Sequence, residues 1–177
     1  MVLIDPPWKM NVKVDYDRLK DEELVNSLPL FKLLDDDGLL FIWLVNAKLA
    51  FTMDWLRDLG FVLVDTLAWF KLTQTNARPL NSYGYYLRHS KELCFLFKKG
   101  RPTHKIQQMK VNDSIVSQFT DKSEKPLLLY EMIHTLVPSG HFLEIFARTR
   151  CIRNGWVSIG NEFEDGPIKT ERRRGKR

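Results

Sequence analysis

Residues 2 to 8 read Val2-Leu3-Ile4-Asp5-Pro6-Pro7-Trp8, and this stretch fixes how the chain begins to fold. The apolar triplet predicts a short buried strand. The two prolines end that strand because neither has a backbone N–H to donate and both hold φ near about −65°. We expect the turn to leave its backbone carbonyls facing outward, beside the Asp5 carboxylate and the flat ring of Trp8.

Two interpretations of this turn follow from the residues. A carboxylate and a carbonyl that accept both protons of an aromatic amino group would direct its nitrogen lone pair for attack, while the base stacks on Trp8. Adenine and cytosine carry such a group. In the simpler interpretation, the segment is a strand followed by a rigid turn with a half-buried tryptophan. The seven residues leave both open.

Length and composition indicate one globular domain. The 177 residues are enough for a sizeable core, and 44% hydrophobic with 28% charged residues is typical of a globular protein. No apolar run approaches the roughly 20 residues that cross a bilayer, so we expect no membrane association. The two cysteines and four histidines lack zinc-ligand spacing, and phosphate-loop, zinc-protease, serine-hydrolase and dinucleotide-binding motifs are absent. We therefore expect an intracellular protein without a bound metal.

The basic excess of the chain lies at its C-terminal end. Residues 169 to 177 contain six basic residues and one acidic residue, a net charge of +5 that accounts for the whole excess, so the preceding body is neutral. We expect a domain over residues 1–165 and a flexible tail over 166–177. Such tails bind nucleic acid or direct nuclear import, although many only improve solubility. The expected location is nuclear, and the expected nucleic-acid contacts here are Lys169, Arg172, Arg173 and Arg174.

Strand-like and helix-like segments alternate along the chain, which predicts an α/β fold with a mainly parallel sheet and helices on both faces. Helical patterns cover residues 21 to 34, with a break at Pro29, and also residues 47 to 59 and 126 to 136. The predicted strands are Val2–Ile4, Leu39–Val45, Phe61–Phe70, Glu92–Phe97, Ser114–Phe119, Phe142–Phe146 and Trp156–Ile159.

Polar residues follow several of these strands, and ligands of open α/β sheets bind at the carboxyl ends of the strands. Asp5, residues 71 to 76 and residues 148 to 150 are expected to meet at this edge. Two long loops accompany them, one at residues 9 to 20 with Tyr16 and one at residues 73 to 90. The second suits either base stacking and phosphate contact or a protein interface, because it contains Arg78, Tyr83, Tyr85, Tyr86, Arg88 and His89.

Residues 1 to about 165 resemble the MT-A70 family of S-adenosylmethionine-dependent methyltransferases, which modify the N6 amino group of adenine. The resemblance implies a Rossmann-like methyltransferase fold with the catalytic strand at the N-terminus. Direct methyl transfer between an aligned amine and a sulfonium needs no metal. The matching residues are Asp5-Pro6-Pro7-Trp8, Trp43, Phe70-Lys71, residues 90 to 94, Lys125-Pro126, residues 144 to 146, residues 155 to 156 and Gly160-Asn161.

The resemblance also implies a role for each matching residue. Asp5, Pro6 and the Pro7 carbonyl would hold the target amino group, and Trp8 and Tyr16 would wall the adenine pocket. Glu92 and Lys125 would line the acceptor site, and the cofactor-binding residues would be Asp5, Lys125, Phe146, Arg148, Asn161 and Glu162. Among them Phe146 would pack near the cofactor adenine, while Asn161 and Glu162 would bind the ribose hydroxyls.

Departures from the family pattern bear on substrate and partner. Arg150-Cys151 stands where the messenger-RNA branch has His-Asn, and Glu124 precedes Lys125 where that branch has a basic residue. These differences favour adenine in DNA, with messenger RNA as the alternative. An intact Asp5-Pro6-Pro7-Trp8 implies the active subunit of a heterodimer with an inactive paralogue, which the loop at residues 83 to 86 could contact. Further nucleic-acid-binding subunits could join them. The competing hypothesis is a non-catalytic scaffold subunit that binds nucleic acid.

Overall fold

Strand β1 (Val2–Ile4) lies inside the sheet, between β2 (Gly38–Leu44) and β6 (Phe142–Ile145), and runs parallel to both. All three of its residues are buried because both faces of the sheet are covered there. The computed structural model describes residues 1–10, 18–75, 77–82, 84–102, 106–119 and 124–161. The short apolar run before the two prolines is therefore a central strand, as the sequence predicts.

The described residues form one seven-stranded sheet in the order β5-β3-β4-β2-β1-β6-β7. The remaining strands are β3 (Val62–Leu72), β4 (Lys91–Lys99), β5 (Ser114–Gln118) and β7 (Trp156–Ile159). The β1–β2, β1–β6, β6–β7 and β3–β5 pairs are parallel, whereas β4 is antiparallel to both β2 and β3. The predicted α/β fold with a mainly parallel sheet is confirmed, with one reversed strand.

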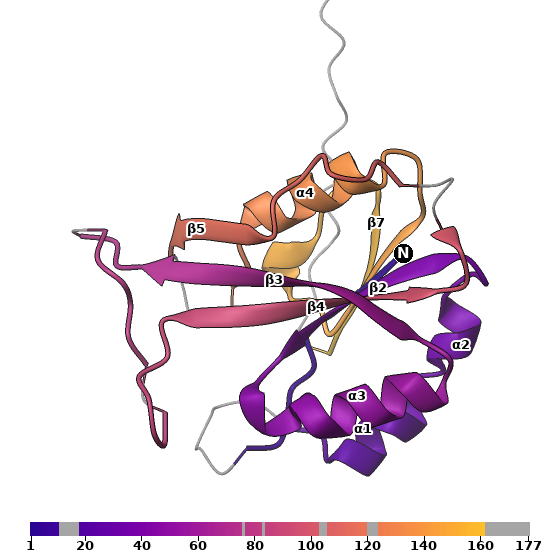
Figure 1. Ribbon diagram of the computed structural model, residues 1–177, viewed down its shortest axis with the longest axis horizontal. Helices are drawn as coiled ribbons and strands as arrows, with labels where there is room; N and C mark the ends of the chain where they lie inside the picture. The colour runs from indigo at the N-terminus through magenta and orange to yellow at the C-terminus, as the bar shows by residue number, and fades with distance from the viewer. Residues whose placement is uncertain (11–17, 76, 83, 103–105, 120–123, 162–177) are drawn as a thin grey trace, which may run out of the picture.

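Helices cover the two faces of the sheet separately (Figure 1). Helices α1 (Asp21–Ser27), α2 (Leu30–Leu33) and α3 (Leu49–Asp58), with the 3-10 turn η1 (Asn46–Lys48), pack on one face. Helix α4 (Leu127–Leu136) packs on the other and buries Leu129 and Ile133 there. The predicted break at Pro29 separates α1 from α2. In the described part of the chain, none of the helices has the length and apolar character needed to traverse a bilayer.

The coverage is incomplete at the β3–β5 side of the sheet. Phe70 on β3 and its register partner Val116 on β5 are 39% and 62% exposed, on the face opposite α4. Trp69 and Ile115, the neighbouring register pair, face α4 and are buried. Helices therefore lie on both faces of the central strands, as predicted, but only on one face of this outer part.

Candidate active site

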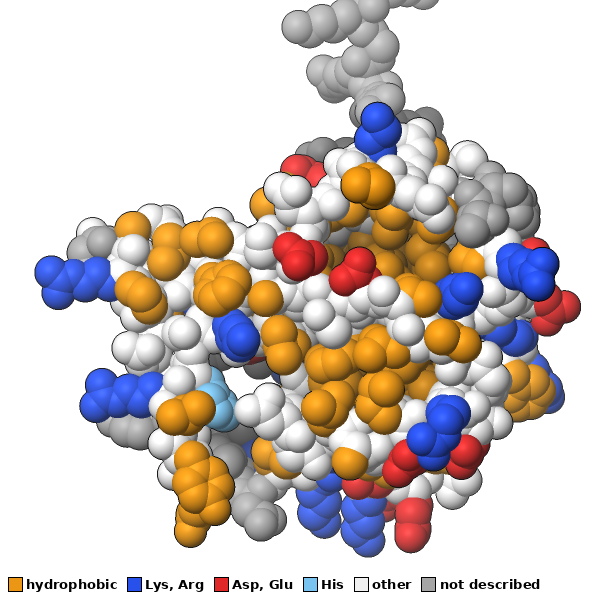
Figure 2. Space-filling model, in the orientation of Figure 1, with side chains coloured by type: hydrophobic (Ala, Val, Ile, Leu, Met, Phe, Trp, Pro, Cys, Tyr) orange, Lys and Arg blue, Asp and Glu red, His pale blue; other side chains and the backbone are white. Residues whose placement is uncertain are grey.

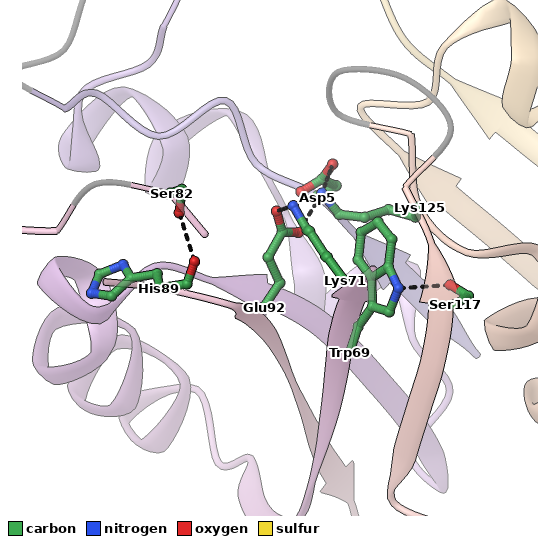
Figure 3. Close-up of polar contacts among 8 residues, drawn as sticks. All are labelled: Asp5, Trp69, Lys71, Ser82, His89, Glu92, Ser117 and Lys125. Carbon is green, nitrogen blue, oxygen red and sulfur yellow. Dashed lines mark hydrogen bonds and ion pairs between the residues drawn. The ribbon is translucent and has the colours of Figure 1, made fainter. Parts of the chain in front are cut away.

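The Asp5 carboxylate and the Lys125 ammonium form the centre of the site (Figure 3). Asp5 directly follows β1 at its carboxyl end, and its backbone N–H donates to the carbonyl of Ile145 at 3.4 Å. Lys125 precedes α4 and places its Nζ 2.8 Å from Asp5 Oδ2. The residue directly after a central strand is thus paired with a residue just before the covering helix.

Two further charged residues extend this pair into a row of alternating charge. Glu92 Oε2 lies 3.3 Å from Lys125 Nζ, and Glu92 Oε1 forms an ion pair with Lys71. Lys71 lies at the end of β3, while Glu92 lies at the start of β4. Because β4 runs antiparallel to β3, its first residues lie at the edge where β3 ends. The predicted convergence of polar residues at one sheet edge is therefore observed for this row.

The charges of the row perturb one another. Removal from water raises the pKa of Asp5 above its ordinary value, even though Lys125 acts to lower it. The same removal from water is outweighed at Glu92, where the ammonium groups of Lys125 and Lys71 lower the pKa. Desolvation acts to lower the pKa of Lys125, but the carboxylates of Asp5 and Glu92 raise it by more. The net effect is a raised pKa, so Lys125 stays protonated. A fixed positive charge thus lies between two carboxylates.

Tryptophan rings hold both ammonium groups in place. Lys71 Nζ lies 4.7 Å from the centroid of the Trp69 ring, and Lys125 Nζ lies 5.1 Å from that of Trp43. The Trp69 indole N–H donates to Ser117 Oγ at 2.8 Å, which fixes this ring in turn (Figure 3). A cation over an aromatic face is stabilised electrostatically. Two buried tryptophans of the sheet therefore help to fix the positions of both lysine ammonium groups.

The structure assigns Trp8 to the core and changes how the turn is understood. Trp8 is 7% exposed, and its indole N–H donates to the carbonyl of Trp43 at 3.1 Å. Little of its ring face is exposed for a base to stack on, and its role in walling the adenine pocket stays a prediction. The simpler interpretation of the turn describes this side chain better, because the ring anchors the turn to β2.

The carbonyls of the turn each accept one backbone hydrogen bond. The Pro6 carbonyl accepts from the Trp8 N–H at 2.8 Å, and the Pro7 carbonyl accepts from the Leu19 N–H at 3.0 Å. A carbonyl oxygen has a second lone pair that can accept another hydrogen bond. The role of the Pro7 carbonyl in holding an amino group stays a prediction.

The ends of β6 and β7 bring the predicted cofactor residues beside Asp5. Phe146 follows β6 with φ of 64°, a left-handed conformation that is unusual for a large side chain. The Arg148 guanidinium is close enough to act to lower the pKa of Asp5. A Cβ at Gly160 would overlap the carbonyl oxygen of Ala147, so only glycine permits this approach, and Asn161 follows it on the surface.

Other predicted site residues lie apart from this centre or outside the described residues. Arg78 and Arg88 are exposed on the segment between β3 and β4. No group of three or more His, Cys, Asp or Glu residues in the described ranges could hold a metal ion.

Lys71 was not among the predicted site residues, although its place directly after Phe70 in the family pattern was a usable signal. Outside the described residues lie Tyr16, Glu162, Lys169, Arg172, Arg173 and Arg174.

The protein has a Rossmann-like methyltransferase fold, in which a seven-stranded α/β sheet carries a charged site at the ends of its strands. Residues 1–162 match the family model MT-A70, and the chain belongs to the MT-A70 family. This confirms the resemblance that the sequence motifs indicate.

Three relatives illustrate the similarity. An N(6)-adenosine-methyltransferase MT-A70-like protein of Drosophila melanogaster is 32% identical over 167 residues, which cover 93% of this chain and 27% of the relative. The human N(6)-adenosine-methyltransferase catalytic subunit METTL3 is 31% identical over 167 residues, covering 93% and 28%. The N6-methyladenosine RNA methyltransferase MTA1 of Cryphonectria parasitica is 29% identical over 175 residues, covering 92% and 51%. The chain thus spans about a quarter of the first two relatives.

Proposed function

We propose that this chain transfers a methyl group from S-adenosylmethionine to the N6 amino group of adenine in nucleic acid. The Asp5 carboxylate, held 2.8 Å from Lys125 at the carboxyl end of β1, is the observation that carries the proposal. Such a carboxylate can accept a hydrogen bond from an aromatic amino group and increase the electron density on its nitrogen. The names of the relatives, which are N(6)-adenosine-methyltransferases, support adenine as the base.

The residues around Asp5 fit S-adenosylmethionine. The cofactor, when bound, supplies an electrophilic methyl group on a positively charged sulfur. Asp5 and Glu92 provide negative charge for that centre, and Phe146 provides apolar surface. Gly160 lacks a side chain where the strand ends approach each other, and the adjacent Asn161 offers an amide to hydroxyl groups.

The two oxygens of Asp5 have different roles in this proposal. Oδ2 contacts Lys125 Nζ, so we assign Oδ1 to the amino group of the target adenine. Lys125 holds the carboxylate in one orientation, and Glu92 with Lys71 holds Lys125. As the amino nitrogen forms its new bond to carbon, positive charge develops on it, and the Asp5 carboxylate stabilises that charge. The carbon–sulfur bond would break with its electron pair left on sulfur, and the surplus proton would pass from the nitrogen to Asp5 Oδ1 and then to solvent.

A methyl-transfer assay with an Asp5→Asn variant tests the proposal. The amide keeps the shape of the side chain but removes its charge, so we expect kcat to fall by about 100-fold or more. The matched control is Asp54→Asn, which removes an exposed carboxylate on α3 and is expected to keep full activity. Calorimetry with S-adenosylmethionine shows whether the variant still folds around its cofactor. An Asp5→Asn variant with normal activity would assign Asp5 a purely structural role.

We propose DNA as the polymer that presents the adenine, with RNA as the second candidate. The departures at Glu124 and at Arg150-Cys151 slightly favour DNA. The printed name of the Cryphonectria relative, an RNA methyltransferase, favours RNA for that protein and makes RNA the second candidate here. Matched DNA and RNA oligonucleotides of one sequence, methylated under the same conditions, decide between them. The preferred polymer is the one with the higher kcat/KM.

We also propose that a paralogous MT-A70 subunit completes the enzyme in the nucleus. The body of the chain has no net charge outside its basic tail, so a partner is expected to supply part of the phosphate contacts. A non-catalytic scaffold subunit is the competing function, and the complete row from Asp5 to Lys71 counts against it. Binding of S-adenosylmethionine, with and without the paralogue, separates the two functions. A scaffold would bind none in either state.

A further inference from the structure

The described residues between β3 and β4, which are 73–75, 77–82 and 84–90, form a projecting arm with an aromatic tip (Figure 1). Tyr85, Tyr86 and Leu87 at the tip are 93%, 90% and 74% exposed. The two tyrosine rings contact each other edge to face, with centroids 4.7 Å apart. Large apolar side chains that are this exposed usually mark a binding surface.

Backbone hydrogen bonds hold the arm in a defined shape. Ser82 and His89 exchange backbone hydrogen bonds of 2.8 and 2.9 Å across it. The Ser82 hydroxyl also donates to the His89 carbonyl at 3.1 Å (Figure 3). Nearer the sheet, the Lys71 N–H donates to the Ser90 carbonyl at 3.1 Å. A Cβ at Gly84 would overlap the carbonyl oxygen of Leu87, so the tip closes tightly. The tyrosines are therefore presented on a structured support.

The charge of the arm selects the kind of partner. Residues 73 to 91 contain three basic residues and no acidic residue. All three, Arg78, Arg88 and Lys91, are exposed. Figure 2 shows basic and apolar side chains together on the projecting left side of the molecule. Exposed aromatic rings beside positive charge are the combination that binds unpaired nucleotides, because the rings stack on bases while the basic groups contact phosphates.

The arm leads directly into the charged row at both of its ends. Its first leg continues β3 from Lys71, and its second leg enters β4, in which Glu92 is the second residue. A nucleic-acid strand lying along the arm would therefore lead toward the row that contains the proposed adenine-binding residue Asp5. An apolar protein partner would not require this continuity or an entirely non-acidic surface.

We propose that Tyr85 and Tyr86 form a stacking platform for unpaired bases that flank the target adenine. This inference rests on the proposed function, since it assigns that site a single-stranded segment of nucleic acid as substrate. The platform is specific to unpaired bases because bases inside a duplex are already stacked on their neighbours.

Binding of a labelled single-stranded 12-residue oligonucleotide tests the platform without requiring activity. We expect the double substitution Tyr85→Ala/Tyr86→Ala to weaken binding by about 10- to 100-fold. Tyr85→Phe/Tyr86→Phe keeps the rings and is expected to stay within about twofold of the wild type. Neither change removes a charge, so the salt dependence of the remaining affinity stays the same, whereas Arg88→Ala makes its slope shallower by about one unit. Binding to the matching duplex is expected to be unaffected.

Photocrosslinking supplies a positive signal for the contact. An oligonucleotide with 5-iodouracil next to the adenine is expected to crosslink to Tyr85 or Tyr86. Equal affinity of the wild-type chain and the Ala variant for the single strand would overturn the proposal. So would an Ala variant that loses only its association with a paralogous protein, because the arm would then be a protein interface. Failure of the proposed function appears differently, as a wild-type chain that binds the oligonucleotide but transfers no methyl group to it.

Discussion

Lys71 is the residue that holds Glu92 in place within the charged row. It shares Glu92 with Lys125, so Glu92 does not draw Lys125 away from Asp5. We expect Lys71→Met to lower kcat by about fivefold, since this partly buried ion pair is worth about 1 kcal/mol, with little change in cofactor affinity. Lys71→Arg keeps the charge and is expected to restore most of the rate. The exposed substitution Lys32→Met serves as control, and unequal losses in kcat and KM identify a positioning role.

Asp5 also predicts a dependence on pH. Removal from water raises its pKa above the ordinary aspartate value, and only the ionised carboxylate carries the negative charge that stabilises the positive charge developing on the amino nitrogen. Activity is therefore expected to be full above this raised pKa and to fall as the pH drops through it. The acid limb of kcat/KM against pH measures this pKa in the unliganded enzyme. Because Lys125 acts to lower the pKa of Asp5, the acid limb of a Lys125→Met variant should lie at still higher pH.

At the scale of elements, the end of β6 stores backbone strain beside the site. Phe146 adopts φ of 64°, which costs a non-glycine residue about 1 kcal/mol or more. Phe146→Gly loses the ring but relieves the strain, whereas Phe146→Ala loses the ring and keeps it. We therefore expect the glycine variant to be more stable than the alanine variant by about 1 kcal/mol, the reverse of the usual order. Urea unfolding measures this difference, and calorimetry is expected to show weakened cofactor binding in both variants.

The strands were predictable from the sequence, whereas their directions were not. Each predicted strand exists within a few residues of its predicted bounds, because continuous apolar runs identify buried strands. The direction of β4 was not predicted, since strand direction depends on connections that an apolar pattern does not encode. For Trp8, a position beside two prolines did not distinguish a stacking face from a core anchor. That distinction depends on the Trp43 carbonyl, 35 residues away in sequence.

Across the whole molecule, the candidate site was predictable only from the order of the family motifs along the chain. Hydrophobic periodicity predicts strands and helices but not which distant residues meet. Asp5, Glu92 and Lys125 are separated by more than 30 residues from one another in sequence, yet their side chains meet at one sheet edge. The motif order indicated all three. Lys71 occurs in the same motif, but its contact with Glu92 requires the antiparallel pairing of β3 and β4. The composition of the loop between these strands was compatible with either nucleic-acid contact or a protein interface. Its position beside the charged row is what favours nucleic acid.

The division of charge between body and tail leads to a prediction for the molecule as a whole. All of the net positive charge lies in residues 169 to 177, outside the described residues. If this segment contacts phosphates, its removal should weaken nucleic-acid binding and make the slope of log K against log salt shallower by several units, up to about four for a single strand. Fluorescence anisotropy at a series of salt concentrations measures both effects.

A variant of equal length, with glutamine at the six basic positions, separates charge from chain length. It should behave like the truncated chain in affinity and in salt slope, because counterion release depends on the number of phosphates neutralised. Methyl transfer at saturating oligonucleotide should be unchanged in both variants, since the row from Asp5 to Lys71 lies in the body. An unaltered salt slope would assign the tail to solubility or nuclear import, and the phosphate contacts would then have to come from the basic arm and a partner subunit.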